Sequence, residues 1–201
     1  MPAPRFWEFA HLSDDFKKMG WVDLVPRAGN LYIGGLHALI QRPDLFKEAK
    51  MTHIVSVLDF DIYERGQFEQ YKHLMIQVDD EPNEILLKHF EQTNAYINEA
   101  LDAGGAVFVH CAMGKSRSAT VVCAYLMWKY GAEPKDALAQ VCEGRAVCSP
   151  NPGFMEQLGV YRQMLKADSK EAADSIYGTW EKDRFTGDWW TWGNRGDAAK
   201  L

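Results

Sequence analysis

Short apolar runs rich in β-branched residues alternate along this chain with longer segments whose apolar positions recur at helical spacing. The short runs predict strands at 31–35, 52–58, 71–78 and 106–109. The longer segments predict helices at 42–49, 84–103, 119–130, 133–143 and 153–165. Because strands alternate with helices, the pattern predicts an α/β fold with a central, mostly parallel sheet flanked by helices. Ligands of such sheets bind beyond the carboxyl ends of the strands.

The two ends of the chain depart from this pattern. Residues 1–28 are mixed in polarity and are interpreted as an N-terminal arm or an extended edge segment, which leaves 29–167 as the main domain. Aliphatic residues are few from 168 to 201, but four of the seven tryptophans lie there: Trp180, Trp189, Trp190 and Trp192. This Trp-rich C-terminal tail is expected either to bind a protein partner or to pack back on the domain.

Composition argues against several classes of protein. With 201 residues, 47% of them hydrophobic and 25% charged, the chain has the profile of an ordinary globular domain. Its net charge of -6 argues against a general nucleic-acid-binding protein, which needs a basic face. No long apolar run predicts a membrane span or a signal peptide, so we expect a cytoplasmic or nuclear location, or both. The four cysteines form no Cys-x-x-Cys pair, so neither a metal site nor a cofactor is expected.

The run at 110–118, His-Cys-Ala-Met-Gly-Lys-Ser-Arg-Ser, contains the candidate chemistry. It places Cys111 and Arg117 at the two ends of a seven-residue loop between a predicted strand and a predicted helix. A helix N-terminus leaves backbone N–H groups unpaired and binds anions, so this loop is expected to bind phosphate. A cysteine at its mouth would be held as a nucleophilic thiolate, and an arginine would match two phosphate oxygens. The arrangement predicts phosphate-ester hydrolysis through a covalent phosphocysteine.

Each residue of this loop has a predicted role. Cys111 is the candidate nucleophile, with a buried core cysteine as the alternative. Arg117 is expected to stabilise the transition state, with a surface ion pair as the alternative. Gly114 allows the loop to turn so that its amides point inward, and Lys115 either attracts acidic substrates or is simply solvated. The predicted substrate-binding residues are Ala112, Met113, Gly114, Lys115, Ser116 and Arg117.

The residues on either side of the loop are expected to support it. Ser118 is expected to hydrogen-bond the cysteine thiolate when it leaves in the second step, to cap the following helix, or to do both. His110 is expected to orient the loop through hydrogen bonds rather than to transfer protons. The reaction also needs an acid for the leaving oxygen and then a base for water. The candidate carboxylates, among which composition does not choose, are Asp79, Asp80, Glu81 and Glu84.

The pattern His-Cys-x-x-Gly-x-x-Arg-Ser at 110–118 resembles the signature of cysteine-dependent dual-specificity protein phosphatases. Further matching segments extend the resemblance over about residues 29–165: 30–35, 76–80 and 150–158. The resemblance implies the cysteine-phosphatase fold, with a phosphate-binding loop between strand and helix. It also implies that Asp80 is the general acid and base and that Asn151 braces the loop. Helix capping is the structural alternative for Asn151.

The loop is most similar to that of fungal members that carry a C-terminal zinc-binding domain. Those members resemble factors that act in late assembly of the large ribosomal subunit, which implies a second role as a ribosome-assembly factor. The chain departs from them because no cysteine follows Cys148, so the ligands of such a zinc domain are absent from it.

The sequence therefore predicts a dual-specificity phosphoprotein phosphatase that accepts phosphotyrosine and phosphoserine or phosphothreonine. No additional tyrosine-clamping loop precedes the strand at 52–58, which favours a shallow pocket. Lipid phosphatases of this chemistry tend to carry two lysines in the loop, whereas Ala112 stands where the first would be. The alternatives are a phosphoinositide or RNA phosphatase with the same site and a non-catalytic phosphate-binding adaptor. The expected partners are phosphoprotein substrates, with neither membrane nor direct nucleic-acid binding.

Overall fold

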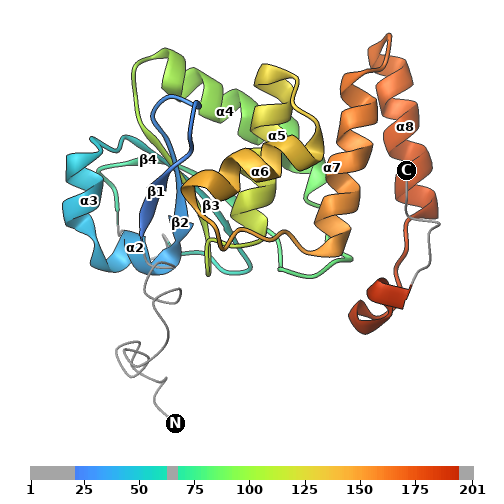
Figure 1. The fold of residues 1–201 in the computed structure, drawn as a ribbon, viewed down its shortest axis with the longest axis horizontal. Helices are drawn as coiled ribbons and strands as arrows, with labels where there is room; N and C mark the ends of the chain where they lie inside the picture. Colours follow the sequence, from blue (N-terminus) through green and yellow to red (C-terminus); the bar gives the residue numbers. More distant parts are fainter. Residues whose placement is uncertain (1–20, 63–67, 195–201) are drawn as a thin grey trace.

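A five-stranded sheet forms the centre of the computed structural model, which describes residues 21–62 and 68–194 (Figure 1). The strands are β1 (Val22–Leu24), β2 (Leu31–Gly35), β3 (His53–Leu58), β4 (Lys72–Gln77) and β5 (Val107–Cys111). Their order is β1-β2-β5-β3-β4; β1 runs antiparallel to β2, and the other neighbours are parallel. The predicted α/β fold with a mostly parallel sheet is confirmed.

Helices cover both faces of this sheet (Figure 1). They are α2 (Leu36–Gln41), α3 (Pro43–Glu48), α4 (Phe90–Asp102), α5 (Arg117–Tyr130), α6 (Pro134–Gly144), α7 (Pro152–Leu165) and α8 (Lys170–Asp183), with two 3-10 turns, η2 (Leu87–His89) and η3 (Trp189–Asn194). Both α6 and α7 begin with a proline, which is favourable there because the first turn of a helix leaves its N–H groups unpaired. α5 ends at Gly131, whose φ of 71° is the left-handed conformation that ends many helices.

The central strand β5 is packed between two hydrophobic cores. Its Val107 and Val109 join the larger core, to which α4, α5, α6 and α7 contribute. Phe108 points to the opposite face, where it packs with Phe46 of α3 and Ala38 of α2. All five residues of β5 are buried. The strand that carries Cys111 is therefore fixed from both faces of the sheet.

Two helix starts differ from the sequence prediction, and two helices were not predicted. The segment at 84–103 becomes helical only at η2, because the N–H groups of Leu86 and Leu87 both donate to the Gln157 side chain. The helix predicted at 119–130 begins at Arg117, so the loop ends inside its first turn. The short helix α2, directly after the glycines that close β2, and α8 in the tail were not predicted.

The two ends of the described chain pack on the domain. In the predicted N-terminal arm, β1 forms an edge strand of the sheet, and residues 1–20 lie outside the described residues. In the tail, α8 lies beside α7 (Figure 1), and its Trp180 donates a hydrogen bond to Glu156 of α7 at 3.0 Å. Residues 195–201 of the tail are outside the described range. Within the residues that are described, no helix combines the length and apolarity needed to cross a bilayer.

Candidate active site

The loop from Cys111 to Arg117, the 111–117 loop, joins the carboxyl end of β5 to the first turn of α5. Gly114 at its middle has a φ of 67°, the left-handed region that disfavours a side chain. A Cβ at this position would lie 2.2 Å from the backbone carbon of Gly34 in β2. Glycine is therefore required here both by the backbone conformation and by the close approach of the loop to the sheet.

The backbone carbonyls of the loop are all hydrogen-bonded: four to other parts of the domain, and that of Ser116 to the first turn of α5. The five acceptor pairs are Ala112 O with Leu36 N at 3.1 Å, Met113 O and Gly114 O with Arg145 at 3.0 and 2.7 Å, Lys115 O with Ser149 N at 2.8 Å, and Ser116 O with Thr120 N at 2.9 Å. In a planar trans peptide the following N–H points the opposite way from the carbonyl. The N–H groups of the loop therefore converge on its centre, as anion binding requires.

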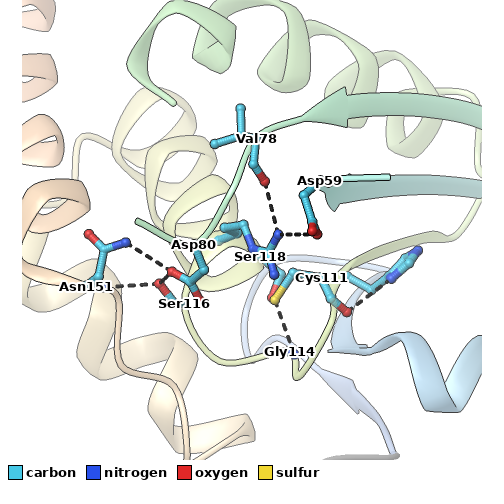
Figure 2. Close-up of polar contacts among 10 residues, drawn as sticks. Asp59, Val78, Asp80, Cys111, Gly114, Ser116, Ser118 and Asn151 are labelled. Carbon is cyan, nitrogen blue, oxygen red and sulfur yellow. Dashed lines mark hydrogen bonds and ion pairs between the residues drawn. The ribbon is translucent and has the colours of Figure 1, made fainter. Parts of the chain in front are cut away.

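Cys111 lies at the base of this ring of N–H groups. Its side chain is buried, but it does not belong to an apolar core alone, because polar groups contact the sulfur (Figure 2). The Gly114 N–H donates to Sγ at 3.2 Å, and Ser118 Oγ lies 3.4 Å from Sγ. Ser118 is the second residue of α5, whose N-cap is Ser116, so the helix-capping alternative for Ser118 is wrong.

Arg117 is buried at the opposite end of the loop, so the alternative of a surface ion pair is wrong. One guanidinium nitrogen, Nη1, donates to the carbonyl of Val78 at 3.0 Å and lies 3.4 Å from Asp59 Oδ1 (Figure 2). Its Nε–H is buried and has no hydrogen-bond partner among the residues that the structure describes. A buried donor without a partner is costly, and a phosphate oxygen in the loop would supply one.

Among the candidate carboxylates, Asp80 is the one bonded to the loop. Its Oδ1 accepts hydrogen bonds from Ser116 Oγ at 2.6 Å and from Asn151 Nδ2 at 3.0 Å (Figure 2). The described residues place no donor on Oδ2. Asp79 and Glu81 are exposed and bond neither to the loop nor to each other in the described part of the chain.

Asn151 has both of the functions considered for it. Its Oδ1 accepts from the N–H of Phe154 and thereby caps α7, while its Nδ2 holds Asp80. Its backbone N–H donates to Ser116 Oγ at 3.1 Å. The same residue therefore connects the start of α7, the 111–117 loop and the candidate acid.

His110 is buried under the loop and stacked on Phe108, with ring centroids 5.5 Å apart. Its Nε2 lies 2.7 Å from Ser56 Oγ, and its Nδ1 lies 3.3 Å from the carbonyl oxygen of Cys111. Burial lowers the pKa of His110 to about 4, so the ring is neutral at pH 7. A neutral, buried ring that is hydrogen-bonded to Ser56 and to the Cys111 carbonyl fits the orienting role and not proton transfer.

The remaining loop residues differ in exposure. Met113 and Lys115 are exposed, whereas Ala112 and Ser116 are largely covered. Burial raises the pKa of Cys148, which lies near Gly114 O, to about 12, so that its thiol stays protonated. Across residues 21–62 and 68–194, no group of three or more His, Cys, Asp or Glu side chains is arranged to hold a metal ion.

Sequence reasoning missed two residues of the site. Arg145, 2% exposed, binds the carbonyls of Met113 and Gly114 and forms an ion pair with Asp23 of β1 at 2.5 Å. No local pattern marks this arginine, because its partners are more than thirty residues away in the chain. Asp59 was detectable, since it follows β3 directly, as Asp79 and Asp80 follow the strand predicted at 71–78.

Comparison with known proteins agrees with this geometry. Residues 31–164 match the family model described as the dual specificity phosphatase catalytic domain. The chain belongs to the dual specificity phosphatase family. The match includes the 111–117 loop, Asp80 and Asn151, so the family resemblance inferred from the sequence motif is confirmed.

Relatives of this family are similar to the chain over about seventy per cent of its length. The tyrosine-protein phosphatase YVH1 of Saccharomyces cerevisiae is 32% identical over 154 residues, and human dual specificity protein phosphatase 22 is 37% identical over 150 residues. These matches cover 68% and 71% of this chain, but 42% of the yeast protein and 79% of the human one. The match to a Dictyostelium discoideum rhodanese-domain phosphatase covers 28% of that protein, so the chain spans less than half of some relatives.

Solved structures show the same fold. The Yvh1 phosphatase domain from Chaetomium thermophilum superposes with a TM-score of 0.66 at 34% identity, covering 74% of this chain and 99% of that domain. Human DUSP28 has a TM-score of 0.66 at 35% identity, covering 73% of this chain and 95% of that one.

Proposed function

We propose that this chain is a phosphoprotein phosphatase that hydrolyses phosphotyrosine and phosphoserine or phosphothreonine through a phosphocysteine on Cys111. The observation that carries the proposal is the 111–117 loop: its five carbonyls bond away from the loop centre, and the Gly114 N–H donates to the Cys111 sulfur. The names of the relatives, tyrosine-protein phosphatase and dual specificity protein phosphatase, support phosphoproteins as the substrate class.

In the first step, the Cys111 thiolate attacks phosphorus in line with the ester oxygen. The S–P bond forms as the P–O bond to the substrate side chain breaks, and Asp80 gives its proton to the departing oxygen. The loop N–H groups and the Arg117 guanidinium, whose Nε–H is buried, bind the oxygens on which charge accumulates. Ser116 and Asn151 hold Asp80 through one oxygen, which leaves the other to transfer the proton.

In the second step, water replaces the cysteine on phosphorus. Asp80, now a carboxylate, takes a proton from the attacking water, and the S–P bond breaks to give inorganic phosphate and the Cys111 thiolate. Ser118 Oγ, 3.4 Å from the sulfur, donates a hydrogen bond to this leaving thiolate. The step returns every group to its starting protonation state.

The test compares wild type with Cys111→Ser on para-nitrophenyl phosphate and on matched phosphotyrosine and phosphothreonine peptides, in EDTA and reductant. We expect hydrolysis of both peptides by wild type and none by the variant. Hydrolysis of the phosphotyrosine peptide alone would overturn dual specificity. Much faster hydrolysis of short-chain phosphoinositides or RNA 5′-phosphates would favour the lipid or RNA alternative, and a folded but inactive wild type would favour the adaptor.

Three further expectations stay predictions. The cytoplasmic or nuclear location, the ribosome-assembly role and a partner for the Trp-rich tail rest on the sequence and its resemblance alone. Localisation of the tagged full chain would test the first, and its presence or absence on large ribosomal subunits in a density gradient would test the second.

A further inference from the structure

The segment that follows α8 binds the loop that carries the candidate acid. In this loop, residues 79–84, Asn83 is three residues beyond Asp80. Arg184 Nη1 donates to the Asn83 carbonyl at 2.7 Å, and Trp192 Nε1 donates to Asn83 Oδ1 at 3.1 Å. In return, Asn83 Nδ2 donates to the carbonyl of Gly187 at 2.8 Å. The backbone carbonyl and both ends of the side-chain amide of Asn83 are thus bonded to residues 184–192.

This contact is part of a packed structure. Trp192 is 8% exposed, and its ring meets Phe185 edge to face, with centroids 5.3 Å apart. Gly187 passes so close to the Phe185 ring that a Cβ there would lie 2.3 Å from it. The Gly187 carbonyl and the Trp192 indole, two of the three groups that bind Asn83, are therefore held relative to one another by packing against Phe185.

The other side of the 79–84 loop rests on α7. A Cβ on Gly153, in the first turn of α7, would lie 1.9 Å from the carbonyl oxygen of Pro82, so the two backbones are in contact. Gln157 Nε2 donates to the Glu84 carbonyl at 2.8 Å. The 79–84 loop is therefore held between α7 on one side and residues 184–192 on the other.

α8 is attached to the domain by the partly buried side chains of Ile176, Tyr177 and Trp180, which pack against the larger core. No residue of α8 is buried, and a cavity of about 860 Å³ lies between α7 and α8, lined by Met155, Val160, Ile176, Trp180 and Trp192 among others. The bonds to Asn83 therefore form a second link between the tail and the domain, separate from the contact of α8 with α7.

We propose that residues 184–192 position the general acid by fixing Asn83 and, through it, the approach of Asp80 to the 111–117 loop. This inference rests on the proposed function. Arg184 and Trp192 are positioning residues, since they bond Asn83 of the 79–84 loop and act on Asp80 through it. The proposal assigns the Trp-rich tail a role in the chemical step instead of, or besides, a role in partner binding.

The test uses two substrates that differ in leaving group. A fluorinated umbelliferyl phosphate has a good leaving group and needs little help from an acid, whereas phenyl phosphate or a phosphothreonine peptide depends on it. Trp192→Phe keeps a ring but removes the donor to Asn83, and Trp190→Phe is the matched control on a neighbouring exposed tryptophan. We expect kcat/KM of Trp192→Phe to fall about tenfold on the poor leaving group, as for loss of one hydrogen bond. On the good leaving group it should change less than about twofold.

A second variant and two references keep the result interpretable. Arg184→Ala should show the same leaving-group dependence, and a Trp192→Phe/Asn83→Ala double variant should be no slower than Asn83→Ala alone. Asp80→Asn shows the largest leaving-group dependence that loss of the acid can produce, and Cys111→Ser gives the background rate of the assay. The inference is overturned if Trp192→Phe and Arg184→Ala lower kcat/KM equally on both substrates, or on neither, in the same experiment in which Asp80→Asn lowers it only on the poor leaving group. Activity in Cys111→Ser would overturn the proposed function instead.

Discussion

Arg145 holds the 111–117 loop from outside it, through two of the loop carbonyls. Its guanidinium donates to the carbonyls of Met113 and Gly114 and forms an ion pair with Asp23, and it is 2% exposed. If Arg145→Met removes this group, two loop carbonyls lose their donor and Asp23 loses its counter-charge. The perturbation therefore acts on the fold and on the direction in which the loop N–H groups point.

The magnitude follows from these contacts. Hydrogen bonds to a charged group contribute roughly 1.5–3 kcal/mol each, and removal of one partner from a buried ion pair costs roughly 3–5 kcal/mol. Because Asp23 retains some contact with water, we expect Arg145→Met to lower the free energy of unfolding by about 3–4 kcal/mol. For a chain of this size that corresponds to a fall in Tm of roughly 6–16 °C.

The assay is urea unfolding together with kcat/KM on an aryl phosphate below the unfolding transition. Arg27→Met is the matched control, because Arg27 forms an exposed ion pair with Glu143 whose loss should change stability little. Arg145→Lys should recover part of the stability through Asp23, but it should recover less of the activity, since one ammonium lacks the planar fork. The reasoning is refuted if Arg145→Met matches Arg27→Met in stability and matches wild type in activity.

Three further predictions concern single groups of the site. The pKa of His110 falls from 6.5 to about 4 on folding, so between these values the unfolded chain binds a proton that the folded chain does not. The free energy of unfolding should therefore drop by about 3 kcal/mol from pH 7 to pH 4. Urea unfolding across this range should show a smaller drop in His110→Gln. Gly114→Ala should abolish most activity in a phosphatase assay, whereas Gly131→Ala, also at positive φ but with open space around it, should cost about 1 kcal/mol and leave activity intact. Ser118→Ala should lower kcat about tenfold with kcat/KM nearly unchanged and produce a burst in stopped-flow traces; an equal loss in both constants would place its role in the first step.

Local sequence was sufficient to predict the centre of the molecule. The strand, glycine loop and helix around Cys111 follow one another directly in the sequence. Their apolar pattern therefore indicates the fold class, and the spacing within the loop places Cys111 and Arg117 at its two ends. The motif resemblance then singled out Asp80, which the structure bonds to Ser116 of the loop. These features need only short-range information or a known motif.

The parts that were missed depend on contacts between distant segments. Arg145 meets the loop more than thirty residues away, and Asn83 meets residues about a hundred positions later in the chain. The tail contains few aliphatic residues, so its helix α8 was not recognised from an apolar face. In the structure, Ile176, Tyr177 and Trp180 pack against the larger core, and Trp180 also bonds Glu156. Pairings of this kind are set by the assembled sheet and helices, not by periodicity.

The most direct test of the mechanism is to trap the intermediate. Asp80→Asn is mixed with an aryl phosphate that has a good leaving group, quenched in acid after one turnover and analysed by peptide mass spectrometry. Because the first step then needs little acid but the second lacks its base, the account predicts one phosphoryl group on the peptide that contains Cys111, absent in Cys111→Ser. A phosphoryl group on any other residue, or turnover by Cys111→Ser, would contradict it.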